Sequence, residues 1–266
     1  MLGYVVYLAV VGFARPLPRA NRVRLTAWGV GLLILVGGLV MAPAWPLAWI
    51  VRDAAPVLYI FICYHASGAL FTAPQPVMEA RFAAFDARIQ RVLGMPASVA
   101  RAPRVVLECL EAAYFGCYVA LPAGYLALAL AGHWEWTDRY WSVVLLAELA
   151  CYAMLPWIRT RAPWSIEAPG PIDGREVALR RLNRFVIRHA SIQVNTCPSA
   201  HTAGALAAAL AITPVMPLAG ALLLLLAAGI VAAIIAGRYH FAGDAVAAVV
   251  TTLAVWAGAV LSGIRS

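Results

Sequence analysis

The segment Leu218–Ile235 reads LAGALLLLLAAGIVAAII and contains no charged residue. An apolar run of about 18 residues is long enough to cross the hydrocarbon core of a bilayer as a helix. The composition of the whole chain agrees, because 64% of its 266 residues are hydrophobic and only 12% are charged. Soluble domains carry about twice that share of charged residues. The sequence therefore predicts an integral membrane protein.

Other apolar runs lie on both sides of this segment. Five of them have a length close to that of a membrane span: Leu25–Met41, Leu47–Phe71, Val105–Ala131, Trp141–Trp157 and His240–Ile264. Ser199–Ile212 is shorter and rich in alanine, so it is predicted to lie inside a helix bundle, where small side chains let helices approach closely. Met1–Phe13 is also short for a span, and its crossing of the membrane is left open.

Two stretches between the apolar runs have the period of an amphipathic helix. The first sets apolar residues against arginines: Met78, Phe82, Phe85, Ile89 and Leu93 against Arg81, Arg88 and Arg91. The second, after Gly174, does the same: Leu179, Leu182, Phe185 and Val186 against Arg175, Arg180, Arg181, Arg184 and Arg188. Both are predicted to lie in the membrane interface with their arginines toward lipid headgroups, although a solvated connecting helix has the same pattern.

The expected fold is thus an all-α integral membrane protein. Residues 46–266 are predicted to form a bundle of six core transmembrane helices together with the amphipathic interfacial helices. Residues 1–45 are predicted to form a separate N-terminal membrane segment with one or two spans.

The net charge of +8 comes entirely from arginine, because the chain contains no lysine. These arginines lie in short loops between apolar runs, so membrane lipids are expected partners and nucleic acid is not. If the spans from Leu25 onward alternate in direction, 17 arginines fall on one face of the membrane and three on the other. The positive-inside rule puts the arginine-rich face in the cytoplasm, and the expected location is the bacterial cytoplasmic membrane.

Three polar clusters stand at span ends on this arginine-rich face. They read RTRAP at 159–163, NTCPSAH at 195–201 and GRYHFAGD at 237–244. His240 and Asp244 are four residues apart, so on a helix they share one face and can form an imidazole–carboxylate pair. His201 begins another helix, where backbone N–H groups favour an anion. With Arg161 and Arg238 as donors to phosphate oxygens, the clusters indicate a phosphoryl-transfer site.

The second and third clusters resemble two motifs of the type 2 phosphatidic-acid phosphatase superfamily. That family carries a Lys-x6-Arg-Pro motif, then Pro-Ser-Gly-His, then Ser-Arg-x5-His-x3-Asp. Here the matching stretches are PSAH at 198–201 and RYHFAGD at 238–244, and the tract Tyr152–Pro163 would hold the first motif. The spacing of five upstream residues resembles the branch related to inositolphosphorylceramide synthases: Asp86, Glu111, Tyr114, Tyr118 and Pro122. The resemblance covers roughly residues 64–266, and it implies that residues 46–266 form a transmembrane catalytic domain.

The resemblance implies a role for each matching residue. His240 would attack phosphorus and become a phosphohistidine, and Asp244 would orient it. His201 would protonate the leaving alcohol and then activate water or an acceptor hydroxyl. The phosphate oxygens would be held by a set of five residues: Arg159, Arg161, Ser199, the backbone of Ala200, and Arg238. The family needs no metal, so neither a metal ligand nor a cofactor is expected, and the expected substrate is a phospholipid or an isoprenoid phosphate.

The chain departs from the family motifs at three points. Ala200 stands where the family has glycine, which a helix N-terminus tolerates when φ is negative. Arg238 lies two residues before His240, whereas the family's arginine lies six before its histidine. Because the chain has no lysine, Arg159 or Arg161 must replace the lysine of the first motif.

Ionisable residues also lie inside the predicted spans. His65 is expected to make a structural hydrogen bond or to line the cavity. Glu108, Glu111 and Glu148 are expected to pair with arginine or tyrosine inside the bundle, since an unpartnered charge is costly there. The five cysteines are interpreted as small apolar core residues.

Four functions remain open at this point. The leading hypothesis is a lipid-phosphate phosphatase that hydrolyses a phosphomonoester or pyrophosphate lipid through a phosphohistidine. A phosphotransferase would use the same residues to move a phospho-headgroup to a lipid or polyol hydroxyl. A membrane transporter would relay protons, but transport sites lie near the midplane, whereas these residues gather at one face. A metal site at His201, His240 and Asp244 fits the ligand types.

Overall fold

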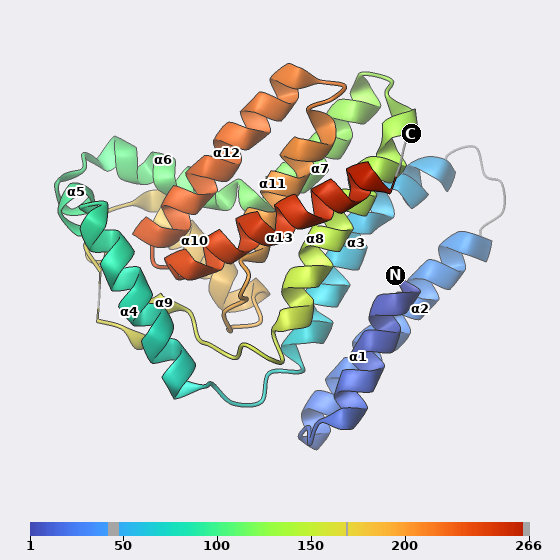
Figure 1. Ribbon diagram of the computed structural model, residues 1–266, viewed down its shortest axis with the longest axis horizontal. Coiled ribbons are helices and arrows are strands. Elements are labelled where there is room, and N and C mark those ends of the chain that lie inside the picture. Colours follow the sequence, from blue (N-terminus) through green and yellow to red (C-terminus); the bar gives the residue numbers. More distant parts are fainter. Residues whose placement is uncertain (42–47, 169, 263–266) are drawn as a thin grey trace.

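The computed structural model describes residues 1–41, 48–168 and 170–262 of the chain. Within these ranges the fold is all-helical, and the one extended pairing is an isolated bridge between Thr160 and Asn195. The predicted all-α class is therefore confirmed (Figure 1). The helices are α1 (Leu2–Ala14), α2 (Arg19–Met41), α3 (Ala48–Gly68), α4 (Pro76–Val92), α5 (Met95–Arg101), α6 (Arg104–Phe115), α7 (Cys117–Leu130), α8 (Thr137–Met154), α9 (Pro163–Ile166), α10 (Ala178–Ala190), α11 (Ala200–Ile212), α12 (Pro217–Ala236) and α13 (Ala242–Leu261), with a short 3₁₀ turn, Trp134–Trp136, before α8.

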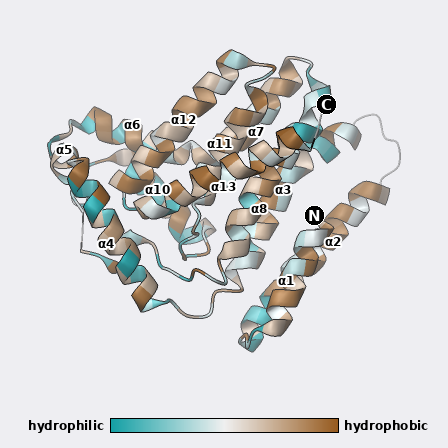
Figure 2. Ribbon diagram, viewed as in Figure 1, coloured by the Kyte–Doolittle hydropathy of each residue, from teal (hydrophilic) through white to brown (hydrophobic). Residues whose placement is uncertain are grey.

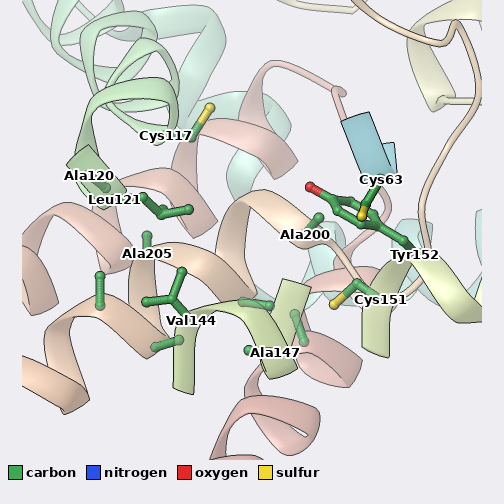
Figure 3. Packing of buried hydrophobic residues seen from close by; sticks show 14 of the residues in the cluster. Cys63, Cys117, Ala120, Leu121, Val144, Ala147, Cys151, Tyr152, Ala200 and Ala205 are labelled. Carbon is green, nitrogen blue, oxygen red and sulfur yellow. The ribbon is translucent and has the colours of Figure 1, made fainter. Parts of the chain in front are cut away.

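Helix α11 lies at the centre of the bundle and packs against α7, α8, α12 and α13. Ten of its 13 residues are buried, and seven of these are alanine, so the neighbouring helices approach its backbone closely. Figure 3 shows Leu121 of α7, Val144 of α8 and Ala205 of α11 close together. A side chain at Gly204 would overlap the carboxylate of Glu148. The prediction that Ser199–Ile212 lies inside the bundle is confirmed.

Three helices in the described part of the chain are long and apolar enough to cross a membrane, namely α2, α12 and α13. Apolar residues run along α12 and along α2 beyond its hydrophilic start, whereas hydrophilic residues are interspersed along α4 (Figure 2). These helices correspond to three of the predicted spans and support the predicted membrane protein. The predicted spans Leu47–Phe71 and Trp141–Trp157 form α3 and α8. Leu47, Ile264 and the proposed domain boundary between residues 45 and 46 lie outside the described residues.

The predicted single span Val105–Ala131 consists of two helices, because the chain bends within it. Helices α6 and α7 meet at Gly116 with an angle of 61°. A Cβ at Gly116 would lie 2.7 Å from Leu226 Cδ1 of α12, so this position has no room for a side chain. The bend lets α6 pack along α12 while α7 packs on α11.

The two predicted amphipathic stretches form α4 and α10, but α10 is oriented differently from the prediction. Arg180 and Asn183 are buried against the bundle, whereas Leu182 and Phe185 are exposed. The expectation that Arg180 faces lipid headgroups is therefore wrong. The reason is that the carboxylates of Glu111 and Asp173 bind its guanidinium, at 2.8 and 2.7 Å.

The three polar clusters lie at one end of the molecule, together with the arginine-rich start of α2. Asn21 donates to the carbonyl oxygens of Ala69 and Phe71 at the end of α3. A few residues further on, Gln75 accepts from the backbone N–H of Arg159 at 2.9 Å, and the next residue, Thr160, pairs with Asn195. Residues from the predicted Arg15–Arg24 loop are therefore on the same side as the predicted site.

Candidate active site

His240 and Asp244 are brought together, as predicted, but not by one helix face. His240 precedes α13, which begins at Ala242, and Asp244 lies in its first turn. His240 Nδ1 is 3.5 Å from Asp244 Oδ2, and both side chains are buried. This separation is longer than a formed hydrogen bond, and His240 Nδ1 has no hydrogen-bond partner among the described residues. Catalytic hydrogen bonds are often long in ligand-free enzymes and shorten in the complex.

The carboxylate of Asp244 is held in place by two further hydrogen bonds to the same oxygen. The backbone N–H of Phe241 donates to Oδ2 at 2.9 Å, which caps the first turn of α13. The side-chain amide of Asn195 donates to it at 2.8 Å. Asn195 also donates to Thr160 Oγ1 at 3.0 Å, so the three clusters meet at this residue. Asp244 is therefore fixed before any ligand arrives.

His201 faces His240 from the first turn of α11. The two imidazole rings are 5.6 Å apart between centroids and nearly perpendicular, at 85°. Tyr114 and Tyr118 each meet the His201 ring edge to face, with centroids 5.7 Å away. The two histidines thus come from separate segments, the start of α11 and the loop before α13, and lie close together, which is what a nucleophile and a proton donor for one reaction require.

The start of α11 is capped by a side chain and tied to the neighbouring helix α13. Ser199 is the N-cap, and its hydroxyl accepts from the backbone N–H of Thr202 at 3.4 Å. The backbone N–H of Ser199 donates to the carbonyl oxygen of Asp244 at 3.0 Å, which ties α11 to α13. Ala200 is buried next to it. Both residues therefore lie beside the two histidines.

A small cavity of about 50 Å³ is lined by His201, His240, Ala200 and Thr196. Five tyrosines from separate parts of the chain also line it: Tyr64, Tyr114, Tyr118, Tyr152 and Tyr239. Tyr114 and Tyr239 stack with centroids 3.8 Å apart. This space, the histidine cavity, is lined by both imidazoles and these aromatic rings, and also by other polar and apolar side chains such as Gln193 and Ile187.

The three arginines predicted to bind phosphate do not line the histidine cavity. Arg161 forms a bidentate ion pair with Glu79 of α4, at 2.9 and 2.8 Å, and this pairing holds the pKa of the Glu79 carboxyl below its usual range. Arg238 binds the carboxylate of Glu167 and the carbonyl oxygen of Ala168.

Arg159 is likewise bound to backbone carbonyl oxygens, of Ala73 at 2.9 Å and of Pro156 at 2.8 Å. Each of the three arginines therefore links segments around the site. None of them donates to a group in the histidine cavity.

Asn195 and Asp86 are site residues to which sequence reasoning gave no role. Asp86 of α4 accepts from the backbone N–H of Ala242 at 2.8 Å, so it caps the start of α13 from a different helix. Burial raises the pKa of this carboxyl above its usual range. Asn195 is the first residue of the second polar cluster, at 195–201, but no pattern in the sequence indicates that its side chain binds Asp244.

The predictions for ionisable residues in the spans have mixed outcomes. Glu111 pairs with Arg180 and Tyr239, as expected, and Glu108 pairs with Arg104 while capping the start of α10. Glu148 is buried, and its Oε2 has no hydrogen-bond partner among the described residues. His65 stacks on Trp28 and makes no hydrogen bond through Nε2.

The five cysteines partly agree with their interpretation as core residues. Four are buried, namely Cys63, Cys117, Cys151 and Cys197, and Cys109 is exposed. Within the described ranges, no three His, Cys, Asp or Glu side chains are grouped to hold one metal ion.

Comparison of the chain with protein-family models, with curated proteins and with solved structures finds no match.

Proposed function

We propose that this chain is an integral membrane phosphatase of lipid phosphates, related to the type 2 phosphatidic-acid phosphatase superfamily. One observation carries the proposal: His240 lies between the anchored carboxylate of Asp244 and the ring of His201, at the wall of a shared cavity. A buried carboxylate beside one imidazole nitrogen leaves the other nitrogen basic and free to attack.

The reaction proceeds in two steps. In the first, His240 Nε2 forms a bond to phosphorus, the bond from phosphorus to the lipid oxygen breaks, and His201 gives its proton to that oxygen. In the second, His201 takes a proton from water, whose oxygen attacks phosphorus and breaks the phosphorus–nitrogen bond. Asp244 accepts a hydrogen bond from Nδ1–H of His240 and stays ionised, so that its negative charge stabilises the positive imidazole of the intermediate.

A second cavity supports a lipid substrate. It has a volume of about 300 Å³ and is lined by apolar side chains of α3, α7 and α10, such as Val57, Leu121 and Val186. It shares Tyr118 and His201 with the histidine cavity. A hydrocarbon chain in this apolar cavity would therefore place its terminal oxygen beside His201.

The proposal includes the bundle of six core spans. In this arrangement α3, α8, α11, α12 and α13 each count as one span, and α6 with α7 forms a sixth, bent one. The buried position of the short α11, surrounded by four helices, supports this reading, since its backbone bonds and small side chains face protein rather than lipid.

A phosphotransferase is the second candidate, and one observation favours it. Glu148 lines the apolar cavity, and its Oε2 has no hydrogen-bond partner among the described residues. A buried polar atom of this kind is satisfied when a ligand donates to it, and the hydroxyl of an acceptor alcohol is such a donor. The intermediate on His240 would be the same, and the alcohol would take the place of water.

Purified protein in detergent tests the two candidates together. Release of inorganic phosphate is measured from a panel of lipid phosphates, with and without a lipid alcohol as acceptor. A phosphatase releases phosphate in both conditions, and a transferase forms a phosphorylated acceptor instead. The absence of both products across the panel would contradict the proposed function.

A larger side chain in the lining of the apolar cavity should weaken the binding of long-chain lipid substrates and leave short-chain substrates unaffected. Val57→Trp is expected to raise the KM for a long-chain lipid phosphate, because the indole occupies space that the hydrocarbon chain needs. A water-soluble short-chain phosphate should be hydrolysed at the wild-type rate. Val51→Trp, on an exposed part of the same helix that does not line the cavity, is the matched control. An equal effect on both substrates would argue against a chain in this cavity.

The proposed site faces the cytoplasm, since it shares its side with the Arg15–Arg24 loop. The test uses single cysteines introduced at the exposed positions Ala20, Glu176 and Glu135. Only Cys109 is exposed among the native cysteines, so Cys109→Ser provides the background. In intact cells a membrane-impermeant thiol reagent should label position 135 and spare positions 20 and 176. The reverse pattern would put the site on the outer face.

A further inference from the structure

A third cavity, of about 130 Å³, lies beside the histidine cavity and is lined by three arginines of α10. Arg180, Arg184 and Arg188 follow one another at intervals of four residues, so they form one ridge on this helix. The remaining lining residues are Trp164, Ile187 and Tyr239, and all three also line the histidine cavity. The two cavities are therefore adjacent, because these three side chains line both of them.

The charges around this arginine cavity do not balance. Arg180 already has two carboxylate partners, because Glu111 binds its Nη1 and Asp173 binds its Nη2. Arg184 shares the same oxygen of Asp173 and remains about two-fifths exposed. Arg188 has no ion pair or hydrogen bond with any described residue. Three cations thus face two carboxylates, which leaves one positive charge in excess.

We propose that Arg184 and Arg188 form a subsite for a second phosphate group of the substrate, and this inference rests on the proposed function. The reacting phosphorus must lie at His240, which does not line the arginine cavity. An anion bound by these arginines is therefore a different group from the one that is attacked. Two planar guanidinium groups are suited to the oxygens of a phosphate.

The order of the three cavities specifies the class of substrate. The apolar cavity adjoins the histidine cavity through His201 and Tyr118, and the arginine cavity adjoins it through Tyr239 and Trp164. A ligand that fills all three has a hydrocarbon tail, then the reacting phosphate, then a second anionic group. This describes a lipid diphosphate or a lipid with a phosphorylated headgroup, and not a simple lipid monophosphate.

The subsite is tested with a lipid diphosphate and a lipid monophosphate that carry the same tail. Arg184→Gln and Arg188→Gln, singly and together, are expected to raise the KM for the diphosphate by about 10- to 100-fold, the loss typical of hydrogen bonds to a charged group. The KM for the monophosphate should stay unchanged. Arg188→Gln breaks no contact in the structure, so its effect does not depend on folding. The matched control is Arg181→Gln, an exposed residue of the same helix that lies outside the cavity.

A binding measurement without turnover accompanies the kinetics. Inorganic pyrophosphate should stabilise wild-type protein in detergent against heat, and the double variant should lose this stabilisation. An equal rise of KM for both lipids, or no rise for either, would overturn the subsite. Binding of free pyrophosphate with an unchanged KM for the lipid diphosphate would overturn the substrate class. Failure of wild-type protein to consume either lipid would instead refute the proposed function.

Discussion

Replacing His240 by alanine is expected to abolish phosphate release from every lipid phosphate that the wild-type protein hydrolyses. The loss should reach about 10⁴-fold or more, because no neighbouring group can take the place of a covalent nucleophile. In the structure Asp244, Asn195 and His201 surround His240, and none of them offers a nitrogen in the same position. The measurement is the steady-state rate in detergent under saturating substrate.

The control for this experiment is His133→Ala. His133 lies just before the 3₁₀ turn and pairs only with Glu135 of the same loop, so its loss should not change the rate. Thermal unfolding of both variants checks that His240→Ala leaves the fold intact. A folded His240→Ala protein that keeps a substantial part of the wild-type rate would eliminate the phosphohistidine, and the chemistry would have to be assigned to other residues.

Replacing His201 by alanine is expected to slow the reaction by a factor that depends on the leaving group of the substrate. A lipid alkoxide is a poor leaving group, so loss of its proton donor should slow the reaction by about 10²- to 10⁴-fold. An aryl phosphate leaves without much protonation, and its first step should be slowed far less. The position of His201 is the reason for this expectation, since it lines both the histidine cavity and the apolar cavity, where the lipid oxygen would lie.

The two substrates are compared in single-turnover experiments, which isolate the first step from the later attack of water. Tyr118→Phe is a suitable control, because it keeps the ring that packs edge to face on His201 and removes only the hydroxyl. If His201→Ala lowers the single-turnover rate equally for the alkyl and aryl substrates, His201 binds phosphate and does not donate the proton.

The sequence predicted wrong partners for several arginines. The reason is that the carboxylates that bind these arginines lie far away along the chain. Arg161 and its partner Glu79 are 82 residues apart, and Arg180 and Glu111 are 69 residues apart. A motif can identify an arginine beside a catalytic histidine, but the nearest carboxylate decides where its guanidinium points. That carboxylate is brought close only when the helices pack.

The sequence by itself determined the features that depend on local chemistry. The apolar runs predicted an all-helical fold with helices long enough to cross a membrane, and the alanine-rich composition of Ser199–Ile212 predicted a buried central helix. The approach of His240 to Asp244 follows from their separation of only four residues. Each of these features depends on neighbours in the chain, whose distance is limited by covalent geometry.

The tertiary structure alone decided the features that depend on contacts between distant segments. It bent the predicted span at Gly116 against Leu226, and it turned Arg180 inward to two carboxylates. It also placed the apolar and arginine cavities next to the histidine cavity, with which each of them shares lining residues. No local pattern encodes these features, because a cavity and an ion pair are set by which helices pack together, and their energies depend on the burial and distance that this packing creates.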